Sequence, residues 1–173
     1  MATRLDFGIG PRQRLLLAAA LSPDKEQGAA ALDEWWSGIA SFDEVHGTDS
    51  GLFAQIHANL GRRIRDPLLA ARMKGAARHV WARNGYMIAD CARIVGALAD
   101  AGIPTMLLKG AAMVVAVDQG MGLRWMSDCD VLVPIDQARP AVRLLAELGF
   151  TERQALRRRD LRTAHGVPLI DPQ

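Results

Sequence analysis

The sequence predicts an α+β fold in which a helical amino-terminal region packs on a small, incomplete mixed β-sheet with flanking helices. Apolar residues recur at helical spacing through the first hundred residues, and short apolar runs alternate with helical segments after Gly102. The 173 residues, half of them hydrophobic, suffice for one core and a small subdomain. We therefore predict a helical region at 1–101 and an α/β core at 102–173.

The helical region begins with an apolar run at residues 15–21. Ser22-Pro23-Asp24 is typical of a helix cap, and it predicts a second helix that runs towards Ala40. Residues 52–60 again carry apolar side chains at helical spacing. These patterns indicate packing and carry no direct information about function.

The longest predicted helix begins at Asp66, the N-cap, with Pro67 at its first helical position. Its apolar residues lie on one face. Asn84-Gly85 interrupts this stripe and predicts a kink or a split. Gly102 is expected to end the helix as a left-handed cap.

Short strands and helices alternate in the predicted core. The predicted strands are 103–108, 128–133, one that begins at Phe150, and 166–170. Lys109-Gly110-Ala111-Ala112 is expected to end the first strand and open a short helix through Val117. Asp136 is expected to cap a helix that Gly149 closes.

The charge is balanced overall but locally uneven. The net charge is only +2, so the composition does not require a polyanionic partner. We interpret the basic stretches 62–83 and 153–162 as solvated faces, with attraction of phosphates or nucleic acid as the alternative. No apolar run approaches the roughly 20 residues that span a bilayer. We therefore expect a soluble, cytoplasmic protein with no membrane partner.

The two cysteines, Cys91 and Cys129, are too few for a disulfide scaffold in a chain of this length. Both lie in apolar patterns. We therefore predict buried, reduced thiols, as expected in the cytosol.

Asp128 and Asp130 form the pattern that points most directly to chemistry. Residues two apart on a strand project to the same face, so these carboxylates are expected to share a face while Cys129 points to the other. Two neighbouring carboxylates repel each other unless a cation lies between them. Mg²⁺ commonly takes one or two carboxylates together with water and phosphate oxygens. The alternative is that both acids lie at an exposed strand end and are merely solvated.

Three further groups make a phosphate site plausible beside this pair. Gly110 lies at a strand-to-helix junction, where backbone N–H groups can approach a phosphate. Lys109 and Arg124 can offset phosphate charge. Each cation taken singly is also compatible with an ordinary surface position.

Two segments carry a resemblance to a known family: Lys109-Gly110-Ala111-Ala112 and Arg124-Trp125-Met126-Ser127-Asp128-Cys129-Asp130. They resemble the uncharacterised nucleotidyltransferase family of the DNA polymerase beta-like superfamily. The resemblance extends through Leu148-Gly149-Phe150 and back to Trp35-Trp36, so it covers nearly the whole chain.

The resemblance implies transfer of a nucleoside monophosphate from an NTP to an acceptor that the sequence does not identify. It implies that Asp128 and Asp130 are catalytic and bind Mg²⁺, with Mn²⁺ as an alternative. It further implies that Lys109, Gly110, Ala111 and Arg124 bind phosphate, although Ala111 cannot supply the hydroxyl of the serine often found there.

The superfamily also uses a third acidic residue on a later strand. We expect that residue after a turn that follows 166–170, so Asp171, which lies in the turn, is not assigned this role. Nothing in the sequence places Glu152 or Asp160 at the site. We therefore expect a chain truncated before its site is complete, with catalysis impaired unless a partner subunit completes it.

Three other functions remain as alternatives. A non-catalytic module that binds a nucleotide or a partner would keep only the scaffold. A glycosyltransferase with an Asp-x-Asp motif would need a nucleotide-binding half where this chain has helices. Nucleic-acid binding through the basic stretch 62–83 is disfavoured, because the chain has only one Tyr and four Phe for base stacking.

Overall fold

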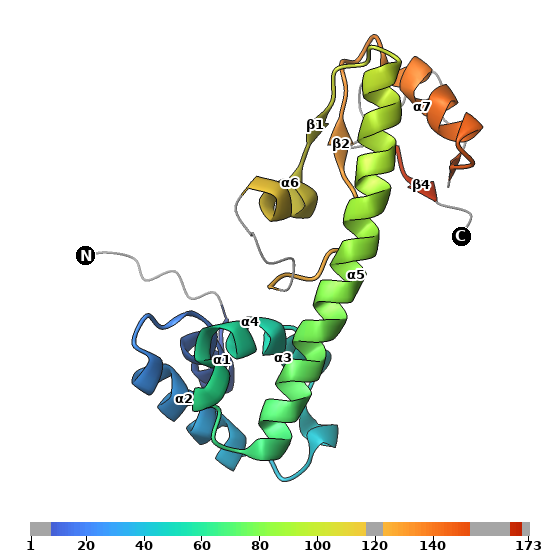
Figure 1. The fold of residues 1–173 in the computed structure, drawn as a ribbon. Helices are drawn as coiled ribbons and strands as arrows, with labels where there is room; N and C mark the ends of the chain where they lie inside the picture. Colours follow the sequence, from blue (N-terminus) through green and yellow to red (C-terminus); the bar gives the residue numbers. More distant parts are fainter. Residues whose placement is uncertain (1–7, 117–122, 153–166, 171–173) are drawn as a thin grey trace. The chain divides into compact units, whose positions relative to one another are not determined.

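The computed structural model describes residues 8–116, 123–152 and 167–170, and most of these residues lie in helices. In these ranges the α-helices are α1 Pro11–Leu21, α2 Lys25–Ser37, α3 Gly47–Ser50, α4 Phe53–Leu60, α5 Pro67–Asp100, α6 Lys109–Ala116 and α7 Ala138–Glu147 (Figure 1). Short 3₁₀ turns lie at Phe42–Glu44 and Gly61–Arg63. The strands are β1 Met106–Leu107, β2 Val131–Leu132, β3 Thr151–Glu152 and β4 Leu169–Ile170. The predicted α+β class is confirmed.

The chain divides into two compact units, and α5 contributes to both. The first unit comprises Met1–Gly85 and Asp118–Met126, and the second comprises Tyr86–Val117 and Ser127–Gln173. This division falls within α5, and the domain boundary between residues 101 and 102 stays a prediction.

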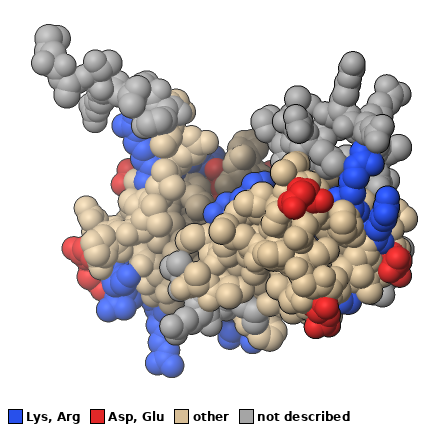
Figure 2. All heavy atoms as spheres, turned by 90° about the horizontal axis from the view of Figure 1, so that it is seen from above, with Lys and Arg blue, Asp and Glu red and all other residues tan. Residues whose placement is uncertain are grey.

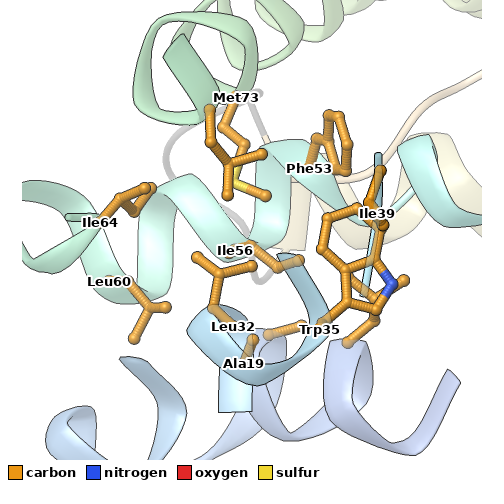
Figure 3. Packing of buried hydrophobic residues seen from close by; sticks show 12 residues of the cluster. Ala19, Leu32, Trp35, Ile39, Phe53, Ile56, Leu60, Ile64 and Met73 are labelled. Carbon is orange, nitrogen blue, oxygen red and sulfur yellow. The ribbon is translucent and has the colours of Figure 1, made fainter. Parts of the chain in front are cut away.

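The first unit is built around a core shared by α1, α2, α4 and the start of α5. Trp35 and Leu32 of α2, Ile56 of α4 and Met73 of α5 are almost fully buried in it, as Figure 3 shows. Asp24 is the N-cap of α2 and accepts hydrogen bonds from the backbone N–H groups of the first turn. Ser22 instead ends α1. Burying such large side chains stabilises the unit by about 1.5–3 kcal/mol each.

The long helix α5 begins and ends where the sequence predicts. Asp66 accepts a hydrogen bond from the backbone N–H of Leu69 at 2.7 Å. Gly102 has a φ of +70°, and the N–H of Ile103 donates to the carbonyl of Leu98 at 2.9 Å. This is the left-handed cap expected for glycine. The predicted split at Asn84-Gly85 is wrong, since the helix runs over 34 residues; one interior glycine costs only about 1 kcal/mol.

We expect replacement of Asp66 with Ala to lower the melting temperature by about 2–4 °C at neutral pH, the usual effect of losing an N-cap. The hydrogen bond from Leu69 lowers the pKa of Asp66 below its ordinary value of 3.8. The Asp66 carboxylate therefore stabilises the fold fully above pH 3.8, and this stabilisation is lost as the pH falls through the lower pKa of Asp66 in the folded protein.

Thermal melts of Asp66→Ala and the parent across pH 2–7 measure this effect. The two proteins should differ at neutral pH and converge in acid. Asp136→Ala removes an exposed carboxylate elsewhere and is the matched control. A difference that did not shrink as the pH falls from 7 to 2 would contradict the capping role.

The second unit has its own apolar cluster, in which the end of α5 packs against α7 (Figure 1). Leu98 and Ile94 of α5, Ala141 and Leu145 of α7, and Phe150 form its buried part. The predicted cap at Asp136 is wrong: the N-cap of α7 is Gln137, and it makes no side-chain capping bond. Packing of the amphipathic face therefore stabilises α7 where a cap does not.

The strands of the second unit form two antiparallel pairs. Met106 lies opposite Leu132 and Leu107 opposite Val131, while β3 pairs with β4. The expected mixed sheet is therefore represented, in the described part of the chain, by antiparallel pairs alone. Each strand has two residues, fewer than the predicted runs, because apolar composition does not determine where a ladder of hydrogen bonds ends.

No helix within the described ranges combines the length and the apolar character needed to cross a bilayer.

Candidate functional site

The junction of β1 and α6 forms a tight backbone corner. Lys109, the first residue of α6, has a φ of +49°, and it is the one non-glycine residue with a positive φ in the described part of the chain. This left-handed conformation is uncommon for a residue with a side chain and tends to occur at functional sites. The N–H of Leu108 donates to the carbonyl of Asp130 at 2.9 Å. The corner therefore lies directly beside the acidic segment.

An ion pair links this corner to the acidic segment. Lys109 Nζ lies 2.9 Å from Asp130 Oδ2. The Lys109 side chain is 68% exposed, whereas that of Asp130 is 31% exposed. The hydrogen bond with Asp130 and its negative charge raise the pKa of Lys109 above 10.5, and the charge of Asp128 adds to the effect. Both carboxylates thus act on the same ammonium group.

The two acids lie just before β2 rather than within it. The predicted strand 128–133 pairs only at Val131–Leu132, and Asp130 extends the pairing through the single hydrogen bond from Leu108. Asp128 is exposed and Asp130 is partly buried. The prediction that both acids lie in a regular strand is therefore wrong, although Asp130 directly precedes the first residue of β2.

Gly110 and Ala111 lie in the first turn of α6, as the sequence predicts. Ala111 is 1% exposed, so its methyl group packs into the protein. The backbone N–H groups at the start of a helix have no intrahelical acceptor and carry a partial positive charge. The turn therefore suits an anion chemically, and the phosphate-binding roles of Gly110 and Ala111 stay predictions.

The cysteines correct the sequence analysis. Cys91 of α5 and Cys129 form a disulfide, with their Cα atoms 5.9 Å apart, so the predicted reduced thiols are wrong. The sequence correctly suggested that Cys91 is buried, but Cys129 is only partly so. Cysteine number alone could not reveal the pair, because bonding depends on the approach of two residues 38 positions apart.

Asn84 is a structural residue that the sequence analysis misread. It is fully buried, its Nδ2 donates to the carbonyl of Arg124 at 2.7 Å, and its Oδ1 accepts from the N–H of Met126 at 3.1 Å. The ring of Trp125 packs against His79, 5.2 Å between centroids, so the whole segment is attached to α5. In the sequence, this structural role could have been suspected from the position of Asn84, a polar residue within the apolar stripe of α5.

Arg124 belongs to the first unit, whereas Lys109, Asp128 and Asp130 belong to the second. Its side chain is exposed, and its backbone carbonyl accepts the bond from Asn84. The role of Arg124 as a phosphate ligand stays a prediction.

The donor set at the corner fits a divalent cation that also binds water and phosphate. Asp128 and Asp130 supply hard carboxylate oxygens, which suit Mg²⁺ or Mn²⁺. Oδ2 of Asp130 is shielded from solvent and faces a cation already, the Lys109 ammonium. Within the described ranges no three His, Cys, Asp or Glu side chains cluster as a metal site. Two carboxylates alone are thus available there, while Asp160 and Asp171 lie outside the described residues.

Four basic residues of the stretch 62–83 have partners within the first unit. Their intramolecular partners are Glu26 for Arg63, Asp33 for Arg65, the Phe42 ring for Arg72 and the Trp125 ring for Arg83. These partners agree with a solvated face better than with a nucleic-acid surface. Figure 2 shows Lys and Arg interspersed with Asp and Glu on the one face of the molecule that it draws. The second basic stretch, 153–162, lies outside the described residues.

A groove on the first unit is lined by none of the predicted site residues. Its lining comprises Leu68, Ala71, Arg72, Gly75, Ala76 and His79, all from α5. No acidic side chain lines it, so it does not offer the carboxylate chemistry of the corner.

Comparison with known proteins identifies one related family. A family model described as uncharacterised nucleotidyltransferase matches residues 34–168, which is most of the chain. No curated protein and no solved structure matches the chain.

Proposed function

The chain belongs to the uncharacterised nucleotidyltransferase family, and on this premise we propose that it transfers a nucleoside monophosphate from an NTP to an acceptor with the help of Mg²⁺. Asp128 and Asp130 would hold the metal. The observation that carries the proposal is the ion pair of Lys109 with Asp130 at the start of α6, where the backbone of Lys109 has a positive φ. It brings carboxylates, a cation and helix N–H groups together in one unit.

The bound metal would supply charge neutralisation at the phosphates and align the reacting oxygens. Asp128 and Asp130 would contribute the ligands that this chemistry requires, and the segment just before β2 would fix their spacing. The first turn of α6 would direct backbone N–H groups towards a phosphate oxygen. Positioning and electrostatics account for most of the catalysis in phosphoryl transfer, so these groups supply the relevant chemistry.

Lys109 would serve as an exchangeable cation. Its ammonium offsets the charge of Asp130, yet 68% of its side chain is exposed to solvent. Asp130 raises the pKa of Lys109 further above its ordinary value, so the ammonium keeps its charge at neutral pH. It would pair with a phosphate oxygen of the bound nucleotide in place of Asp130.

We expect Lys109→Ala to weaken NTP binding about tenfold or more, the loss expected for a charge-assisted hydrogen bond. Calorimetry with an NTP and Mg²⁺ measures the dissociation constant. Lys74→Ala removes an exposed lysine from α5 and is the matched control. Equal affinity in Lys109→Ala and the parent protein would remove Lys109 from the phosphate site.

A transfer assay tests the proposed function itself. The protein is incubated with Mg²⁺ and each of the four α-labelled NTPs, and pyrophosphate release is followed together with label transfer to protein, hydroxyl compounds and phosphorylated acceptors. Metal-dependent pyrophosphate release with a labelled product supports the proposal. NTP binding in the absence of both products contradicts it.

The second candidate is a non-catalytic module that binds a nucleotide or a partner. It is favoured by one observation: within the described ranges, no third metal-ligating side chain joins Asp128 and Asp130. The same calorimetry separates the two functions when it is run beside the transfer assay. Binding without turnover identifies the module, and turnover identifies the transferase.

A further inference from the structure

The disulfide joins α5 to the residue that lies between the two candidate metal ligands. Cys91 is 2% exposed within α5, and Cys129 is flanked by Asp128 and Asp130. Neither the family match nor the proposed chemistry assigns a role to this bond. Its position gives it direct influence over the backbone that carries both carboxylates.

Within the described part of the second unit, the acidic segment has few other attachments. The ladder between β1 and β2 has two residue pairs, the N–H of Leu108 donates to the carbonyl of Asp130, and the largely exposed Lys109 side chain pairs with the Asp130 carboxylate. The disulfide adds a covalent attachment one residue earlier. A loop that is free to sample several conformations must be ordered before two of its side chains can bind one ion. The covalent bond removes part of this cost in advance.

We propose that Cys91 and Cys129 form a redox-controlled tether that sets the metal affinity of the Asp128–Asp130 pair. The oxidised protein holds the two carboxylates in place for the cation, and the reduced protein releases the segment from α5. This inference rests on the proposed function, because it names the regulation of the same site.

The chemistry of the switch is thiol–disulfide exchange with a small thiol and its disulfide. A thiolate attacks the sulfur of Cys129, which is the more exposed partner, and the sulfur–sulfur bond breaks to leave Cys91 as a thiolate. A second small thiolate attacks the mixed disulfide and releases Cys129, while the two small molecules leave as one disulfide. Both protein thiolates then take up protons. Oxidation by the small disulfide reverses these steps.

Amide hydrogen exchange of the parent protein in both redox states tests the tether without a metal. Peptide mapping first confirms the Cys91–Cys129 link in the oxidised protein. We expect residues 127–132 to exchange about tenfold faster after reduction, the effect of freeing roughly one ordered residue. Residues 11–21 of α1, in the other unit, are the internal control. Equal exchange of 127–132 in the two states would overturn the tether.

Mn²⁺ titration calorimetry tests whether the tether changes the metal affinity of the Asp128–Asp130 pair. We expect the oxidised protein to bind Mn²⁺ about tenfold more tightly than the reduced protein. In Cys91→Ser and Cys129→Ser the affinity should match that of the reduced parent and should not respond to the small disulfide. Equal affinities of the oxidised and reduced parent overturn this inference and leave the proposed function standing. Loss of binding in both states contradicts the proposed metal site itself.

Discussion

Asp130→Asn should reduce metal-dependent nucleotidyl transfer by about 10²–10³-fold. A metal ion contributes several kcal/mol of transition-state stabilisation in such reactions, and each 1.36 kcal/mol corresponds to a factor of ten in rate. The change keeps the volume of the side chain and removes the charge that a cation requires. It also removes the ion pair with Lys109.

Turnover with saturating NTP and Mg²⁺, measured beside Mn²⁺ calorimetry, checks this expectation. Asp136→Asn is the matched control, because it removes an exposed carboxylate from the turn after β2, and it should retain full activity. Circular dichroism melts establish that both variants fold. A folded Asp130→Asn protein with the turnover of the parent would rule out the assignment of Asp130 as a metal ligand.

Asn84→Ala should lower the free energy of unfolding by about 2–4 kcal/mol. Asn84 is fully buried and satisfies the carbonyl of Arg124 and the N–H of Met126. Alanine would leave both backbone groups without these partners, and each unsatisfied buried group costs about 1–3 kcal/mol. Met126 is itself buried, so water does not readily replace the lost bond.

Urea unfolding measures the loss, provided that the slope with denaturant stays that of the parent. Arg78→Ala alters an exposed position on the same helix and should change the free energy by less than about 0.5 kcal/mol. Asn84→Ala with the stability of that control would show that solvent satisfies Arg124 and Met126 equally well.

The predicted and observed structures agree best where a few neighbouring residues decide the outcome. The Asp66 cap, the left-handed Gly102 and the turn from β1 into α6 each depend on atoms within about five positions of one another. The same holds for the backbone corner between β1 and α6, since Lys109, Gly110 and Ala111 are consecutive. The class of the fold follows from such local patterns repeated along the chain.

The differences arise where a residue's partner is distant in the sequence. Asn84 was read as a helix breaker, because its partner Met126 is 42 positions away. The predicted cap at Asp136 failed because packing of α7 against α5 stabilises the helix without one. The strands were overestimated because the apolar pattern continues past the last paired residue.

The sequence by itself determined the helical segments, the turn at Lys109–Gly110–Ala111 and the position of the two acids just before a short strand, because local backbone preferences depend on adjacent residues. Only the tertiary structure decided that Lys109 pairs with Asp130 and that Cys91 bonds to Cys129. Those pairings form when segments 21 and 38 residues apart meet, and the burial of many side chains at once selects which segments do so.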